Sequence, residues 1–155
     1  MSEPGFKLFL LAVHNLLRWA IVILAIYALV RTALGWLQQK KWSGTDQRAV
    51  SLFTISLDLQ LLVGLLLYFI FSDLTKAAFA DFGAAMGNQV LRFFAVEHSL
   101  LMAIAVAVAH IANSVGKKDL PDKLKFQRAA IFIVVAIALI AAGIPWTTRP
   151  LLPNF

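Results

Sequence analysis

The sequence has no cysteine and few charged residues, and these two shortages exclude several classes of protein. Without cysteine, the chain cannot form disulfides, thiolate metal sites, iron–sulfur clusters or the covalent attachment of a c-type haem. Charged residues make up 14% of the 155 residues, whereas soluble domains contain roughly a quarter. Since 61% of the residues are hydrophobic and the mean hydropathy is +0.81, most of the chain is predicted to face lipid.

The motifs of soluble enzymes are missing as well. The chain contains no P-loop, no glycine pattern of a dinucleotide-binding fold, no HExxH and no Ser-His-Asp constellation. The net charge of +6 would suit nucleic-acid binding, but the basic residues lie beside apolar runs, which is typical of membrane topology signals. Hydrolase, kinase and nucleic-acid-binding functions are therefore not predicted.

Four apolar stretches predict an all-α integral membrane protein, a four-helix bundle that forms one domain over residues 1–155. Each stretch is near or above the ~20 residues that a helix needs to cross a hydrocarbon core. The first is too long for the apolar region of a signal peptide, so we expect it to remain as a helix. The predicted helices cover roughly residues 8–37, 49–72, 90–115 and 129–146.

Basic residues near the helix ends predict the orientation of this bundle. Nine of them flank the connections after the first and third helices, and four lie near the opposite ends. The larger group is expected in the cytoplasm, so the bundle runs up-down-up-down in a bacterial inner membrane with both termini outside. The nine are Arg31, Lys40, Lys41, Arg48, Lys117, Lys118, Lys123, Lys125 and Arg128; the four are Lys7, Lys76, Arg92 and Arg149.

Two histidines within the spans are matched in depth. Ionisable groups at the bilayer centre cost about 2.5–3.5 kcal/mol each on insertion scales, so they should face the bundle interior. At 1.5 Å per residue, His14 lies about 7–8 Å and His98 about 9 Å outside the centres of the first and third helices. Two histidines at one level on different helices are what the iron of a b-type haem requires as axial ligands. We therefore predict one haem b near the outer leaflet.

Arg18 and Asp58 also lie inside the spans, both near the bilayer centre. Arg18 is one turn from His14, and Asp58 is on the second helix. We expect them to form an ion pair, because either charge alone would be costly to bury. The pair would fix helix packing, relay protons or, through Arg18, bind a haem propionate.

The remaining polar residues leave alternatives open. Arg92 marks the outer interface, where it would hold a haem propionate or a lipid phosphate. Glu97 points about 100° away from His98 and is expected to lie against another helix. His110 lies 12 residues after His98, about 120° around the helix, so it is either an additional ligand or an interface residue.

The connection at residues 72–89 is the longest between two predicted helices. It is expected to form a short amphipathic helix on the outer surface. Lying over the level of His14 and His98, it would roof a sheltered pocket suited to a lipid-soluble molecule such as a quinone.

Several segments resemble a group of small bacterial four-helix membrane proteins labelled cytochrome b or cytochrome b-like. The resemblance spans nearly the whole chain and rests on His14–Trp19, Asp58–Gly64 running into Leu67–Phe69, Arg92–His98, and Ile144–Trp146 followed by Arg149. It implies haem b and electron transfer. One position departs from the pattern: Asp58 stands where relatives are expected to carry a histidine, which argues against a second haem near His110.

Two functions from different classes remain open. One is a membrane electron carrier with a haem b on His14 and His98, exchanging electrons with quinone or with a protein partner. The other is a non-catalytic accessory subunit of a larger complex or homo-oligomer, with a pigment-binding variant. Transport through Arg18, Asp58 and Glu97 is less favoured, since four short helices leave little room for alternating access. Whether the chain is itself an enzyme stays open.

Overall fold

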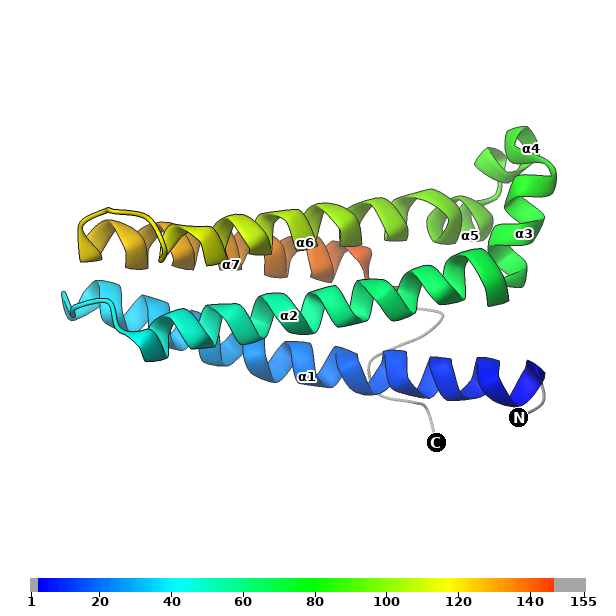
Figure 1. Ribbon diagram of the computed structural model, residues 1–155. Helices are drawn as coiled ribbons and strands as arrows, with labels where there is room; N and C mark the ends of the chain where they lie inside the picture. Colours follow the sequence, from blue (N-terminus) through cyan, green and yellow to red (C-terminus); the bar gives the residue numbers. More distant parts are fainter. Residues whose placement is uncertain (1–2, 147–155) are drawn as a thin grey trace.

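The computed structural model describes residues 3–146, which form helices and no strands (Figure 1). Four long helical segments make up a bundle, and two of them contain a π-helical turn. The segments are α1 (Glu3–Leu37); α2 (Gly44–Leu66) with a π-helical turn (Leu67–Phe71); α5 (Gln89–Arg92), a second π-helical turn (Phe93–Glu97) and α6 (His98–Val115); and α7 (Asp122–Gly143).

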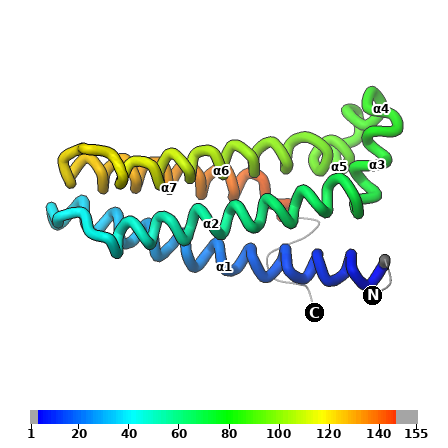
Figure 2. Tube along the Cα trace, in the orientation of Figure 1, coloured from blue at the N-terminus to red at the C-terminus, as the bar shows by residue number. Residues whose placement is uncertain are grey.

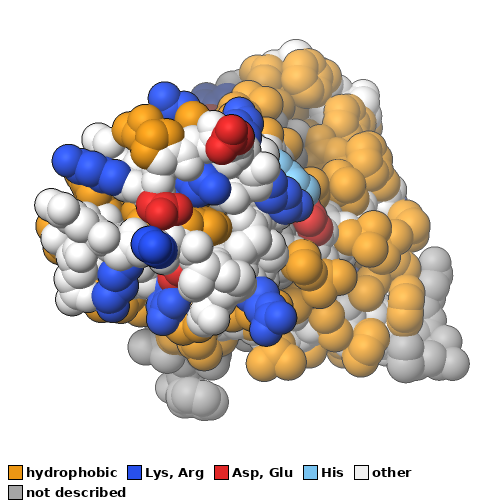
Figure 3. Space-filling model, turned by 60° about the vertical axis from the view of Figure 1, so that its left-hand side comes forward, with side chains coloured by type: hydrophobic (Ala, Val, Ile, Leu, Met, Phe, Trp, Pro, Cys, Tyr) orange, Lys and Arg blue, Asp and Glu red, His pale blue; other side chains and the backbone are white. Residues whose placement is uncertain are grey.

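All four segments are long and apolar enough to cross a membrane, in agreement with the predicted multi-pass bundle. Figure 3 shows hydrophobic side chains covering the flank of the bundle, while Lys and Arg side chains gather at the end formed by the connections 38–43 and 116–121. Leucine and isoleucine side chains such as Leu16, Ile23 and Leu62 are more than half exposed. A surface of this kind suits contact with lipid chains.

Three of the helices begin at least five residues earlier than the apolar runs predict, α1 at Glu3, α2 at Gly44 and α7 at Asp122. The second starts at Gly44 because Ser43 caps it: the Ser43 hydroxyl accepts from the Asp46 amide (3.4 Å), and Asp46 Oδ2 accepts from the Ser43 amide (3.0 Å). The fourth starts at Asp122, directly after Pro121. A polar first turn of a helix lies outside the membrane core. Because its residues are not apolar, the apolar run in the sequence does not include them.

The helices are arranged so that α1 and α6 lie diagonally. Helix α1 packs chiefly against α2 and α7, and α6 packs against the same two helices. The connections 38–43 and 116–121 lie together at one end of the bundle (Figures 1 and 2). From that end to the middle, the core is closed by small or fully buried side chains, among them Ala28, Ala49, Phe53, Ala109 and Ile133.

The opposite end carries two short helices instead of the single one predicted for residues 72–89. They are α3 (Asp73–Ala80) and α4 (Phe82–Gly87). A new helix begins because the Asp81 carboxylate accepts from the Ala84 amide at 2.9 Å, as an N-cap does. Lys7 Nζ lies 2.6 Å from Asp73 Oδ2 and ties α1 to α3. Arg149, counted among the basic residues outside the membrane, lies beyond the described residues.

Candidate functional site

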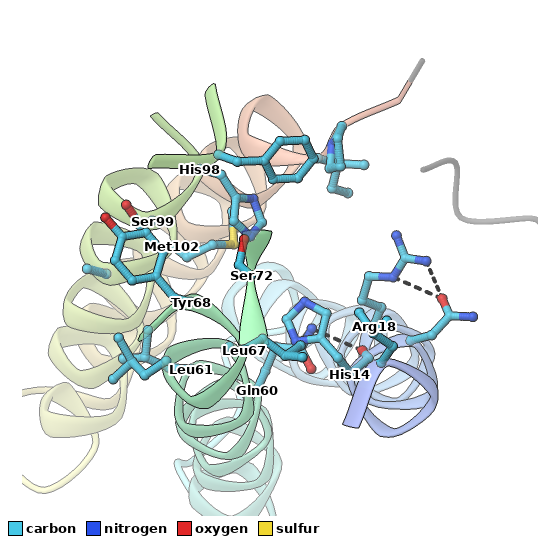
Figure 4. A pocket seen from close by; sticks show the side chains of 18 of the residues that line it. His14, Arg18, Gln60, Leu61, Leu67, Tyr68, Ser72, His98, Ser99 and Met102 are labelled. Atoms are coloured by element: carbon cyan, nitrogen blue, oxygen red, sulfur yellow. Dashed lines mark hydrogen bonds between the residues drawn. The ribbon is translucent and has the colours of Figure 1, made fainter. Parts of the chain in front are cut away.

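A cavity of about 640 Å³ lies between the long helices, in the half of the bundle away from the connections 38–43 and 116–121. Its size falls within the roughly 300–1,000 Å³ of small-molecule and cofactor sites. Most of its wall is apolar. Figure 4 shows the exceptions that matter: His14 and Arg18 from α1, Gln60 from α2 and His98 from α6 all line it. The structure thus brings both depth-matched histidines and Arg18 to one cavity.

The ring of His98 is oriented by the end of α7. Its Nδ1 lies 2.7 Å from the carbonyl oxygen of Gly143, the last residue of that helix. A carbonyl only accepts, so Nδ1 carries the proton and donates, which leaves Nε2 of the neutral ring as the nitrogen with a lone pair. The last carbonyls of a helix lack intrahelical partners, and His98 satisfies one of them.

Glycine at position 143 allows this close approach. A Cβ at Gly143 would overlap the terminal methyl of Met102 and lie 3.3 Å from the Cβ of Leu101, both on α6. Small residues at such crossings let two backbones come together in membrane bundles. The absence of a side chain therefore brings the Gly143 carbonyl within reach of the His98 ring.

His14 is held by two residues one turn apart on α2. Gln60 Nε2 donates to the carbonyl oxygen of His14 at 3.1 Å. A Cβ at Gly64 would lie 3.5 Å from Cε1 of the His14 ring, so the ring packs directly over the glycine. Gln60 Oε1 is buried and has no hydrogen-bond partner within residues 3–146. Buried polar atoms normally have a hydrogen-bond partner, so this oxygen is available to accept a further hydrogen bond.

Two π-helical turns flank the cavity, one in each of two neighbouring helices. Leu67, Tyr68 and Phe71 of the first turn line the cavity, as does Phe94 of the second. The Tyr68 hydroxyl donates to the carbonyl oxygen of Ala95 at 2.6 Å and so joins the two turns. A π-turn wraps an extra residue into the helix and changes which side chains face inward; such turns are frequent at functional sites.

Arg18 and Asp58 each contact another residue instead of forming the ion pair expected from the sequence. Arg18 Nε donates to Asn15 Oδ1 at 3.1 Å, and Asp58 Oδ1 lies 2.8 Å from His110 Nε2. The reason is the face of α2: Gln60 contacts α1, and Asp58, two residues earlier, is about 200° away and faces α6. The matched depth of Arg18 and Asp58 predicted their ion pair. The pair does not form because Asp58 lies on the face of α2 that is turned toward α6.

His110 belongs to the groove between α2 and α6 and not to the cavity. The side chains of His110 and Asp58 are 54% and 42% exposed. They continue a row of polar contacts between these helices, in which Asn113 Oδ1 accepts from Gln47 (2.7 Å) and Ser51 (2.8 Å). Interhelical hydrogen bonds of this kind fix the register of membrane helices. His110 does not line the cavity, and its role as an additional ligand stays a prediction.

Arg92 and Glu97 pair with each other. Arg92 Nε lies 2.7 Å from Glu97 Oε1, and Arg92 Nη1 donates to the Met86 carbonyl at 3.1 Å. The π-turn between the two residues brings side chains five positions apart together. That Glu97 lies against another helix stays a prediction. Arg92 is not among the residues that line the cavity, and its role in holding a haem propionate stays a prediction. A role in binding lipid phosphate stays a prediction.

Sequence reasoning missed several residues of the site. Gln60 could have been found, since it is a lone carboxamide in an apolar run. Gly64 stands in a run of leucines, and nothing in the sequence links it to His14. The roles of Tyr68 and Gly143 depend on contacts between segments distant in the chain, so no local signal marks them.

The cavity lacks the ligands for a bare metal ion. No group of three or more His, Asp or Glu side chains that could hold one occurs in the described part of the chain. No protein-family model matches the sequence, and neither do the curated proteins or the solved structures compared with it. The resemblance to cytochrome b-like proteins accordingly stays a prediction from the residues.

Proposed function

We propose that the chain is a b-type cytochrome-like membrane protein that carries electrons on one haem b, with His14 and His98 as axial ligands. The observation that carries this proposal is that two imidazoles from diagonal helices line one cavity of about 640 Å³. Helices α2 and α7 lie between α1 and α6, so a flat macrocycle bridging the diagonal would be enclosed on its edges. A macrocycle brings its own equatorial nitrogens and asks the protein only for axial ligands.

The residues around the two histidines support this role. Histidines that bind metals usually donate their other ring nitrogen to a carbonyl or carboxylate, as His98 does to Gly143. Gly64 leaves room beside His14 for a flat ring. Arg18 lines the same cavity and offers guanidinium donors of the kind that bind carboxylates, which haem propionates carry. When bound, haem b supplies reversible one-electron transfer; the chain binds, orients and shelters it.

The charge distribution supports an orientation of the bundle in the membrane, and the cavity rim supports an electron partner. With nine basic residues against four, the connections 38–43 and 116–121 belong on the cytoplasmic side of a bacterial inner membrane. Both termini and the cavity are then on the outer side. Ser72 and the first turn of α3 line the cavity, so the rim lies where the second helix leaves the membrane. A lipid-soluble quinone that reaches this rim from the bilayer is the proposed electron partner.

Spectra of the purified protein test the proposal. Absorption is recorded in the oxidised and dithionite-reduced states, and a pyridine haemochrome assay gives haem type and amount. His14→Ala and His98→Ala should each remove the haem while the protein remains inserted. His110→Ala is the matched control, since His110 is also within a span but outside the cavity; it should retain about one haem b per chain.

Two results would overturn the assignment. Retained haem absorbance in both His14→Ala and His98→Ala would exclude them as ligands. A colourless wild-type protein from haem-replete cells would favour the accessory-subunit alternative. In that case Gln60, Arg18 and the histidines stabilise helix packing only, and co-purification with a larger assembly is expected.

A further inference from the structure

A second groove lies at the other end of the bundle, between the end of α6 and the beginning of α7. Its volume is about 290 Å³, and Ile111, Val115, Lys118, Arg128, Ile131 and Phe132 line it. Four of these residues are apolar and two are cationic. Figure 3 shows that Lys and Arg side chains are plentiful at this end of the molecule. Lys118 and Arg128 both border this apolar groove.

Neither cation has a partner of opposite charge among the residues that the structure describes. Within residues 3–146, no ion pair or side-chain hydrogen bond involves Lys118 or Arg128, although Asp119 and Asp122 lie in the same region of the chain. Arg31 and Arg92, by contrast, do have such partners: Arg31 lies 2.6 Å from Asp46, and Arg92 lies 2.7 Å from Glu97. The groove therefore has an uncompensated positive charge at its rim.

The groove is polar near the membrane surface and apolar farther in. Lys118 lies in the connection that precedes α7, and Arg128 is six residues into α7, about 9 Å along its axis. Ile131 lies about one turn deeper than Arg128, and Ile111 one turn deeper than Val115. A ligand that fits both parts has an anionic head at the membrane surface and a hydrocarbon chain.

We propose that this groove binds an anionic phospholipid. The phosphate lies between Lys118 and Arg128, and an acyl chain follows Ile111, Ile131 and Phe132. A guanidinium matches two phosphate oxygens at once, and the lysine adds a second positive charge. Basic pockets between helices on the cytoplasmic side of a membrane are suited to such head groups. The proposal is independent of haem, because the groove is at the opposite end from the histidine cavity.

Native mass spectrometry of the detergent-purified full chain tests this site. The protein is mixed with phosphatidylglycerol or phosphatidylcholine of identical acyl chains, and bound lipid is counted. Wild-type protein should retain phosphatidylglycerol about tenfold or more over phosphatidylcholine, and Lys118→Gln/Arg128→Gln should lose that preference. Lys117→Gln/Lys123→Gln removes the same charge from the same end without touching the groove and should behave as wild type.

A third variant separates binding in the groove from loss of charge or of fold. Ile131→Trp fills the apolar part while both cations remain, and it should also reduce retention of phosphatidylglycerol. Thermal unfolding of each variant in lipid-free detergent shows that the bundle is intact. Equal retention by Lys118→Gln/Arg128→Gln and wild type would overturn the proposal. Equal loss in the Lys117→Gln/Lys123→Gln control would also overturn it, because binding would then follow net charge alone.

Discussion

Gly64 offers a test of the space that His14 requires. A Cβ at this position would lie 3.5 Å from Cε1 and 4.0 Å from Nδ1 of the His14 ring, which is ordinary van der Waals contact. Gly64→Ala should therefore leave the ring in place and retain haem. Since alanine replaces a glycine within a helix, the free energy of unfolding should rise by roughly 0.5–1 kcal/mol.

A larger side chain at the same position should have the opposite effect on the cofactor. In Gly64→Leu, the atoms beyond the Cβ extend into the space of the ring or of the cavity beside it. Because the cavity can accept them, the loss of stability should stay below the roughly 1–3 kcal/mol of overpacking in a closed core. Haem affinity should fall at least tenfold, or about 1.4 kcal/mol, because the leucine and the macrocycle compete for one volume.

The assay pairs haem content with an unfolding titration in mixed detergent micelles. Gly87→Leu is the control, since a Cβ at Gly87 meets nothing within 4 Å; it should keep both haem and stability. Full haem content in Gly64→Leu would refute the arrangement of His14 over Gly64. Loss of haem in Gly64→Ala would refute it as well, because a methyl group fits there.

Three further predictions concern the rest of the bundle. Gly35→Ala should destabilise the bundle by about 1–3 kcal/mol, because the new Cβ overlaps the fully buried ring of Phe126. Adding Phe126→Leu to the same chain should recover part of the lost stability. Strictly additive losses in the double variant would contradict the contact. Asn113→Leu removes the acceptor of two hydrogen bonds from α2, at 2.7 and 2.8 Å, and should lower the unfolding free energy by about 1 kcal/mol; an unchanged unfolding midpoint would count against it. The ammonium of Lys7 holds the pKa of Asp73 below its ordinary value of 3.8. The contribution of this contact to stability is therefore present above pH 3.8 and is lost as the pH falls below that value. Hydrogen exchange in α3 should increase at the lower pH in wild type and not in Asp73→Asn.

The depth of the site could be predicted from the sequence, and the partners of its residues could not. His14 and His98 were matched by counting residues, because the rise of a helix is constant and the apolar runs locate the membrane. Pairing Arg18 with Asp58 by the same count failed. Depth carries no information on rotation, and Asp58 faces α6 while Gln60, two residues later, faces α1.

By itself, the sequence determined that this is an all-helical chain with four segments able to cross a membrane, and that two histidines lie at one level. Hydropathy and helical rise are local properties, so they can be read along the chain. Only the tertiary structure decided which helices are neighbours, where the core stays open and which carbonyl orients His98. These three features depend on which face each helix turns to its neighbours and on the close approach of two helices at Gly143. They also depend on the two π-turns, which change the direction in which the following side chains point. Such features arise from packing between segments distant in the chain, which a linear pattern does not contain.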